Sequence, residues 1–293
     1  MRQFEKNKLI DQIKDIYNNV DCSFNFHKKA SHFLKLMETR KFLSETFEKN
    51  LIEKSFIKKK WKSYEIPKLT IYEDEDFSLY YHIFCPIKNS NSEIASYLIH
   101  DHQNYILSSY IFFGNGYKTI EFAKKANDNF EKYKLTIIKN FHHSNKNINI
   151  LDSHTPHVIF NVPETTSSIV LWSKDQRSAE KVESRISYFI ENKKIKKINE
   201  EEFINKTEKI KNFENDSEKH IEAICFLLQK NKYENDRFLN EIIGKESTND
   251  KWKKCLKKLV AKTPIFEPIF KHNTNTFNMD IRKKDIENLC NFQ

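Results

Sequence analysis

The stretch from residue 64 to residue 173 constrains the fold most, because its apolar residues fall into short runs. The runs are rich in aromatic and β-branched residues, which favour strands. Four of the six prolines also lie in this stretch, and proline interrupts long helices. Polar turns separate the runs, which read LTIY, FSLYYHIFC, ASYLIH, YILSSYIFF, KTIEF, KLTIIKNF, HVIFNV and SSIVLWS. The pattern predicts an antiparallel sandwich or barrel.

Apolar residues recur at helical spacing on both sides of this stretch. Before it, the spacing is clearest at Leu9, Ile10, Ile13 and Ile16. After it, the spacing returns at Ile186, Phe189 and Ile190, and again at Ile221, Ile224, Cys225 and Leu228. We therefore expect an α+β protein with an N-terminal helical region at 1–63, a β-barrel at 64–174 and a C-terminal helical region at 175–293. Residues 191–220 are highly charged and are expected to form exposed helices and a linker.

The chain carries 50 basic and 41 acidic residues, which gives a net charge of +9. Such a balance can indicate a nucleic-acid partner. Arginine, which reads phosphates and guanine bidentately, is nevertheless scarce beside lysine. We therefore assign the charge to the solvated surface and expect no nucleic-acid partner. Nucleic-acid binding by the basic C-terminal region is the alternative, and salt-dependent binding would support it.

The five cysteines are spread along the chain and contain no C-x-x-C pair. This pattern argues against a disulfide framework and for a reducing compartment. The N-terminus lacks the apolar core of a signal peptide, and no apolar run reaches the ~20 residues that cross a bilayer. We expect a cytoplasmic protein without membrane contact, whose helical regions could form a homodimer interface.

Histidines gather in the predicted strands, where His100 and His102 stand one residue apart. Side chains alternate along a strand, so both imidazoles should point to one face and could hold one metal ion. A third ligand must then come from another strand. His157, at the start of a run, is the best candidate, and His154 is the second. The pair His142 and His143 is weaker, because it lies in a predicted polar turn.

Each of these residues also has a structural interpretation. His100, His102 and His157 could be packed core histidines, and two spaced histidines alone would favour that reading. His82 and Tyr110 lie in aromatic runs and could pack in the core or line a cavity. The same two readings apply to Trp172.

The stretch from His100 to Gly114 and the stretch from His157 to Asn161 resemble the paired motifs of the cupin superfamily. The first motif is similar to His100, His102 and the glycine turn at Gly114, and the second is similar to the spacing from His157 to Asn161. The resemblance covers about residues 64–173. It implies a double-stranded β-helix that holds a metal on His100, His102 and His157, and the added motif positions favour a metal site over packed histidines.

The cupin glutamate position falls at Leu107, which cannot bind a metal. The resulting set of three neutral histidines resembles that of the thiol dioxygenases, of which cysteine dioxygenase is one, and implies Fe(II) as the cofactor. This chain departs from that subgroup at the Ser-x-His-x-Tyr positions, which hold Val170, Trp172 and Lys174. It also departs at the Pro-x-Gly of the second motif, which holds Asp152 and His154. These departures argue against cysteine as the substrate.

The sequence therefore predicts a mononuclear Fe(II) oxygenase or dioxygenase that uses O2 on a small molecule, such as a thiol or an amino-acid derivative. Asp101 or Asn161 could orient a ligand imidazole. Lys68 is nearest to the family's carboxylate-binding arginine and could hold a substrate carboxylate. Imidazole also suits Zn, Cu and Ni, so a redox-silent metal serving isomerisation or hydrolysis is an alternative. A cupin that senses a ligand without turnover is another.

Overall fold

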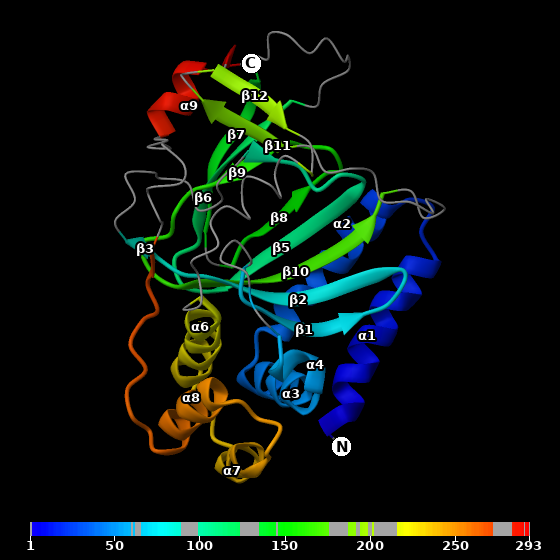
Figure 1. The fold of residues 1–293 in the computed structure, drawn as a ribbon. Helices are drawn as coiled ribbons and strands as arrows, with labels where there is room; N and C mark the ends of the chain where they lie inside the picture. The colour runs from blue at the N-terminus through cyan, green and yellow to red at the C-terminus, as the bar shows by residue number, and fades with distance from the viewer. Residues whose placement is uncertain are drawn as a thin grey trace.

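The computed structural model describes residues 2–59, 61, 66–88, 99–123, 135–144, 146–175, 187–191, 194–198, 201, 216–271, 283–289 and 291–292. Two mainly antiparallel sheets occupy the centre and top of Figure 1, and most of the helices lie beside and below them. The mixture of helices and antiparallel strands confirms the predicted α+β class.

The first sheet faces the helices. It contains, in spatial order, β1 (Lys68–Glu73), β2 (Phe77–Phe84), β10 (Thr166–Lys174), β5 (Tyr105–Phe113) and β8 (Ile148–Leu151). All neighbouring strands in it are antiparallel. Both faces of its central strands are largely buried, because one side packs on helices and the other faces the second sheet.

The second sheet contains seven described strands, among them the two that carry His100 and His157. In spatial order they are β12 (Lys194–Ile198), β11 (Ser187–Glu191), β4 (Ile99–His100), β9 (His157–Ile159), β6 (Tyr117–Phe122), β7 (Thr136–His143) and β14 (Asn291–Phe292). Only β14 is parallel to its neighbour among these described strands. A separate parallel pair joins β3 (Ile87–Lys88) to β13 (Phe270–Lys271).

The strands pair in nested order along the chain. The innermost pair is β6 with β7, followed outwards by β5 with β8, β4 with β9, and β2 with β10. Successive pairs alternate between the two sheets. This is the strand order of a jelly roll, the layout that cupins share. The nesting brings His100 on β4 directly opposite His157 on β9, although 57 positions separate them in the sequence.

The N-terminal helices cover the outer face of the first sheet. They are α1 (Arg2–Asn18), α2 (Ser23–Leu34), the 3₁₀ turn η1 (Lys35–Met37), α3 (Arg40–Ile52) and α4 (Lys54–Ile57). The Asn50 amide fixes α3 to β1, because it donates to Thr70 O at 2.8 Å and accepts from Thr70 N at 2.9 Å. Thr39 begins α3 by accepting a hydrogen bond from Phe42 N at 3.2 Å.

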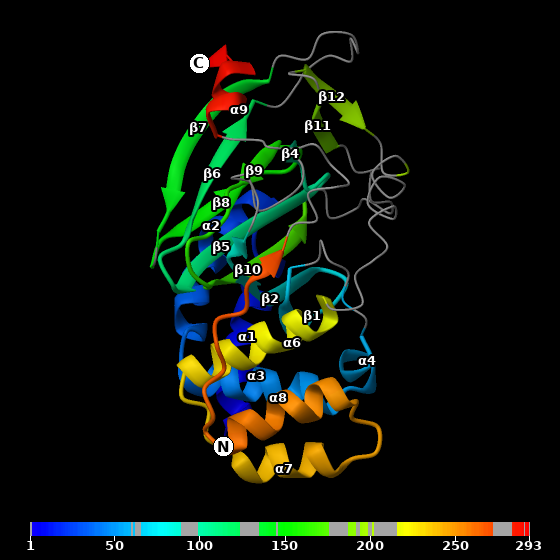
Figure 2. The same ribbon diagram turned by 60° about the vertical axis from the view of Figure 1, so that its left-hand side comes forward.

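The C-terminal helices α6 (Asp216–Lys230), α7 (Asp236–Gly244) and α8 (Asp250–Val260) lie below the sheets, next to α3 (Figure 2). A short helix, α9 (Lys283–Leu289), lies at the opposite end (Figure 1). One hydrophobic cluster runs from the N-terminal helices through the first sheet to α6 and α8. The three zones of the sequence therefore share one core.

The start of the C-terminal region differs from its predicted helical character. Ser187–Glu191 and Lys194–Ile198 form the hairpin β11–β12, and β11 pairs with β4 at Ser187 and His100. The apolar positions Phe189 and Ile190 fit a short strand as well as a helix turn, and pairing with β4 decides between them. Most of the predicted linker after Ile198 lies outside the described residues, as do residues 89–98 of the run before His100.

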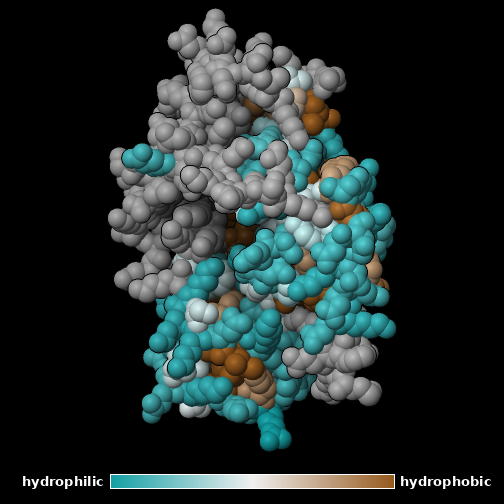
Figure 3. Space-filling view, turned by 90° about the vertical axis from the view of Figure 1, so that its right-hand side faces the viewer, coloured by the Kyte–Doolittle hydropathy of each residue, from teal (hydrophilic) through white to brown (hydrophobic). Residues whose placement is uncertain are grey.

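The described surface exposes few large apolar side chains. Figure 3 shows a largely hydrophilic face over the described helices and strands. The exposed large hydrophobic residues are Leu36, Ile52, Ile66, Ile138 and Phe266. Among the described residues, no helix has the length and apolar character that crossing a membrane requires.

Candidate metal centre

Three histidines meet between the two sheets. The ring centroids of His100 and His157 lie 4.4 Å apart, those of His102 and His157 lie 4.5 Å apart, and those of His100 and His102 lie 5.4 Å apart. One ring nitrogen of each lies within 4.8 Å of the others. In the described part of the chain this is the one group of at least three histidine, cysteine or acidic residues with such spacing. The structure thus brings together the three residues that the sequence predicted as ligands.

A turn, rather than a continuous strand, places His102 beside His100. Strand β4 ends at His100, and Gln103 has a left-handed φ of 57°. Asp101 stabilises this turn, since its Oδ1 accepts a hydrogen bond from Gln103 N at 3.1 Å. The turn then enters β5, as Tyr105 N donates to His102 O at 3.1 Å. Asp101 therefore shapes the backbone between the two ligands.

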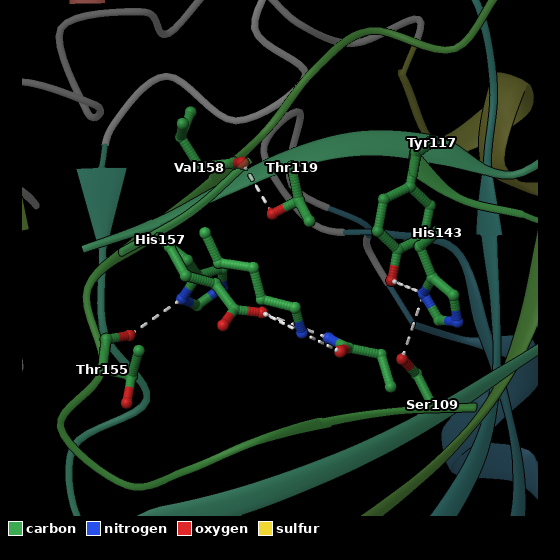
Figure 4. A network of polar contacts seen from close by, with 10 residues as sticks. Ser109, Tyr117, Thr119, His143, Thr155, His157 and Val158 are labelled. Carbon is green, nitrogen blue, oxygen red and sulfur yellow. Dashed lines mark hydrogen bonds and ion pairs between the residues drawn. The ribbon is translucent and has the colours of Figure 1, made fainter. Parts of the chain in front are cut away.

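The ring of His157 is oriented by a backbone carbonyl. Its Nδ1 lies 3.1 Å from Thr155 O, to which it donates a hydrogen bond (Figure 4). This bond favours the tautomer in which Nε2 is unprotonated and is the nitrogen that could bind a metal. Sequence reasoning had looked to Asp101 or Asn161 for this task. Thr155 was missed because any residue type offers a carbonyl, so only the backbone path reveals it.

Trp172 borders the site on the side of the first sheet. Its ring centroid lies 4.4 Å from that of His102 and 6.1 Å from that of Tyr105. In the strand register Trp172 pairs with Leu107, which also faces the space between the sheets. The indole Nε1 is buried and has no hydrogen-bond partner among the described residues. Trp172 could have packed in the core or lined the site, and the structure places it at the wall of the site.

A polar row lies deeper between the sheets. Lys68, His82 and Ser168 are neighbours across β1, β2 and β10. Burial, and then the charge of Lys68, lowers the pKa of His82 to about 3, so this imidazole is neutral at physiological pH. The Lys68 Nζ lies 4.0 Å from the ring centroid of Tyr80. Ser168 Oγ is buried and has no hydrogen-bond partner in the described part of the chain.

An apolar cluster lies beyond the polar row. It consists of Phe84, Ile111, Tyr117 and Val162, with Ile159 packed against it. The rings of Phe84 on β2 and Tyr117 on β6 connect the two sheets, with their centroids 5.0 Å apart. The polar row therefore lies between the histidines and this apolar cluster.

Polar side chains also join the sheets where β7 approaches β8 and β5. Lys139 Nζ donates to Asn149 Oδ1 at 3.0 Å and lies 3.6 Å from Glu121 Oε1. His143 lies 3.2 Å from Tyr117 Oη and 3.5 Å from Ser109 Oγ through its Nδ1 (Figure 4). Burial lowers the pKa of His143 to about 4. His143 and His142 belong to β7, which corrects the predicted polar turn, and neither joins the three-histidine group.

Three predicted site residues have other partners. Tyr110 faces the helices, where its hydroxyl donates to Glu38 Oε2 at 2.6 Å. Asn161 holds β3, because its amide makes 3.0 Å hydrogen bonds with both N and O of Ile87. His154 lies in the turn before His157 with a left-handed φ of 52°, and is not in the ligand group. These contacts give Tyr110 and Asn161 structural functions.

The donor set fits a transition metal. Imidazole nitrogens bind such ions at about 2.1 Å, so ligands on one ion lie at most roughly 4 Å apart. The ring nitrogens lie within 4.8 Å of one another, close to that spacing. All three histidines are neutral, so they would not themselves offset the charge of a bound divalent ion. Such a centre favours an anionic ligand in its remaining positions.

No protein-family model matches this chain, and no curated protein matches it in sequence. Solved structures with partial likeness include a protein with a double-stranded β-helix domain from Klebsiella pneumoniae. That match has 16% identity and a TM-score of 0.26, and covers 42% of this chain and 90% of the other. The cupin domain of Cnp3 from Schizosaccharomyces pombe matches with 15% identity, 37% and 64% coverage and a TM-score of 0.25.

KdgF from Halomonas sp. matches with 14% identity and a TM-score of 0.27, and covers 40% of this chain and 88% of the other. At such scores the likeness is too low to support an argument. The jelly-roll layout rests on the nested strand pairing, and the metal centre rests on the geometry of the three histidines.

Proposed function

We propose that this protein is a mononuclear metal-dependent oxygenase of the cupin type, with Fe(II) on His100, His102 and His157. The observation that carries the proposal is the convergence of three neutral imidazoles between the sheets of a jelly roll. Bound Fe(II) would offer open coordination positions where a substrate and dioxygen meet and exchange electrons.

The chain's own residues give that site its shape. His100 and His157 hold adjacent positions in the second sheet, and the turn at Asp101 brings His102 to the same point. Trp172 borders one side of the site, with its ring centroid 4.4 Å from that of His102. The Thr155 carbonyl, by accepting from Nδ1 of His157, would leave Nε2 to bind the ion.

The proposed substrate is a small organic anion. Lys68 supplies a positive charge in the polar row, and the neutral ligands leave the ion's charge to attract a second anionic group. Ser168 Oγ and Trp172 Nε1 offer hydrogen-bond donors that no described residue satisfies. Buried polar groups are normally paired, so a polar substrate is a fitting partner for both. A thiol or amino-acid derivative with a carboxylate has this chemistry.

Oxygen uptake tests the proposal directly. The protein, reconstituted anaerobically with Fe(II), would be mixed with thiols and small carboxylic acids in aerated buffer while an electrode follows dissolved O2. We expect substrate-dependent uptake that His157→Ala reduces at least about 100-fold, since the loss of even a supporting contact costs 10–100-fold. His142→Ala, which removes an exposed histidine outside the group, is the matched control. Iron binding with no uptake for any substrate would instead support the redox-silent or ligand-sensing alternatives.

A further inference from the structure

A buried carboxylate lies beside the metal ligands, on a residue that the sequence motifs do not include. Glu121 on β6 is directly opposite His157 on β9, which is in turn opposite His100 on β4. Glu121 is only 7% exposed. Side chains opposite one another in adjacent strands share a face, so Glu121 faces the same space as the two histidines.

The strand register brings this carboxylate close. Phe122 N donates to Pro156 O at 2.8 Å, and Phe160 N donates to Lys118 O at 2.9 Å. These bonds identify the hydrogen-bonded pairs of the β6–β9 ladder. Glu121 and His157 therefore form a non-hydrogen-bonded pair, the kind in which Cα atoms are only about 4.5 Å apart and side chains lie closest.

The partners of Glu121 hold it loosely. Asn149 Nδ2 donates to Glu121 Oε1 at 3.4 Å, and Lys139 Nζ lies 3.6 Å from the same oxygen. Both distances are longer than those of strong charged hydrogen bonds, which are about 2.7–2.9 Å. Lys139 is also 45% exposed, so solvent weakens its attraction. Burial makes the charged form of this carboxylate less favourable, and Asn149 and Lys139 offset that cost only in part.

We propose that Glu121 is the charge partner of the metal centre. Its carboxylate would lie beside His157 and offset the positive charge of the divalent ion without binding it directly. Leu107, at the position of the cupin glutamate, cannot supply that negative charge. A divalent cation next to a buried carboxylate gains attraction that three imidazoles cannot provide. Glu121 is therefore a positioning residue that raises metal affinity. This inference rests on the proposed metal centre.

Metal titration of the intact protein tests the inference. Apo-protein would be titrated with Co(II) by calorimetry and by absorption in the visible range, for wild type, Glu121→Gln, Glu121→Asp and Lys139→Met. We expect Glu121→Gln to weaken Co(II) binding by about 10–100-fold, the range known for residues that support ligands. Glu121→Asp keeps the charge and should recover part of the loss. Lys139→Met removes a competing cation and should strengthen binding.

Glu121→Gln and Lys139→Met should change Co(II) affinity in opposite directions, which distinguishes an effect of charge from an effect on the structure. If Glu121 only joined the sheets, Glu121→Gln and Lys139→Met would change stability in the same direction and leave Co(II) affinity and its spectrum alone. Glu38→Gln is the matched control, because Glu38 also contacts a lysine but lies among the N-terminal helices. Unfolding midpoints measured on the same samples verify that each variant is folded.

Unchanged Co(II) affinity in folded Glu121→Gln would overturn the inference and leave the three-histidine centre intact. If wild type itself binds no Co(II), both the inference and the proposed metal centre are wrong. Weaker binding in Glu121→Gln together with stronger binding in Lys139→Met would support it.

Discussion

His27 shows how a single imidazole can fix a helix to a sheet. It is fully buried, and its two ring nitrogens lie 2.7 Å from Ser108 Oγ and 3.0 Å from Ser173 Oγ. The two serines belong to β5 and β10, so one side chain on α2 spans two strands. Burial lowers its pKa to about 3, and the ring is neutral in the folded protein.

This neutral ring makes stability depend on pH. The pKa of His27 is about 3 in the folded protein, against 6.5 for an ordinary histidine, so the unfolded chain takes up a proton first as pH falls. Stability is therefore lost between about pH 6.5 and pH 3. From pH 7 to pH 5 the loss that His27 causes is about 2 kcal/mol.

The change His27→Gln removes that loss while a polar side chain remains to meet the serines. We expect the unfolding free energy of this variant to fall about 2 kcal/mol less than that of wild type between pH 7 and pH 5. Urea denaturation at the two pH values measures the difference. His32→Gln on the same helix is the control, and equal pH dependence in His27→Gln and wild type would contradict a neutral buried ring.

At the same scale, sequence reasoning predicted the three histidines that the structure brings together, but not their surroundings. The spacing of His100 and His102 suggested the group, and the motif positions at Gly114 and Asn161 favoured a metal site over packed histidines.

For Tyr110 the sequence left open a place in the core or at a cavity, because both faces of β5 are apolar and the alternation that marks an inner face is missing. Its register opposite Ile169 places it in the core beside the helices. Glu121 was missed because its position beside His157 depends on pairing between strands that are distant in the sequence. Thr155 was missed because its contact with His157 uses a backbone carbonyl, which no residue type marks.

At the scale of elements, the turn between β5 and β6 depends on glycine. Gly116 has a φ of +86°, and a Cβ built on it would lie 1.9 Å from His143 O. Gly114 has a φ of +79° and would place a Cβ 2.5 Å from Thr165 O. This turn joins the strand that carries Leu107 to the strand that carries Glu121, so its shape sets the position of both.

The variant Gly116→Ala should therefore destabilise the protein. A left-handed backbone costs a non-glycine residue about 1–3 kcal/mol, and the contact with His143 O adds to that cost. Chemical denaturation followed by circular dichroism gives the change in unfolding free energy. Gly244→Ala is the control from the same chain, because Gly244 lies in α7 and a Cβ there meets nothing within 4 Å. It should be neutral or stabilising by up to about 1 kcal/mol. A neutral Gly116→Ala would contradict the turn geometry.

The hairpin β11–β12 illustrates why element prediction failed at residues 187–198, although the helix predicted around Ile221 is present as α6. Isoleucine and phenylalanine at short intervals satisfy a helical template and a strand template alike over so few residues. The exposed edge of β4 settles the choice, because its backbone pairs with β11 at Ser187 and Tyr188. The strands of residues 66–174 were easier to predict, since prolines and polar turns delimit them.

At the scale of the whole molecule, helices and the first sheet share a core. Trp252 on α8 is fully buried, and its ring centroid lies 5.6 Å from that of Phe56 and 6.4 Å from that of Phe47. Asn249 Nδ2 donates to Ile57 O at 3.0 Å beside it. The C-terminal helices are thus bound to the N-terminal ones, which cover the sheet.

We therefore expect the helices and the first sheet to unfold together. Tryptophan fluorescence, which includes Trp172 on β10 and Trp252 on α8, should change at the same denaturant concentration as far-UV circular dichroism. Trp252→Ala should lower the unfolding free energy by about 3–5 kcal/mol and keep the two transitions coincident. Separate transitions in wild type would contradict a shared core.

The central claim is that His100, His102 and His157 hold one metal ion, and anaerobic metal analysis tests it most directly. The protein would be purified without oxygen and reconstituted with Fe(II), beside the double variant His100→Ala/His157→Ala. We predict about one iron per chain in wild type, in line with a single three-histidine group, and none above background in the folded variant. Equal iron in both proteins, or none in wild type, would contradict the metal centre and with it the oxygenase.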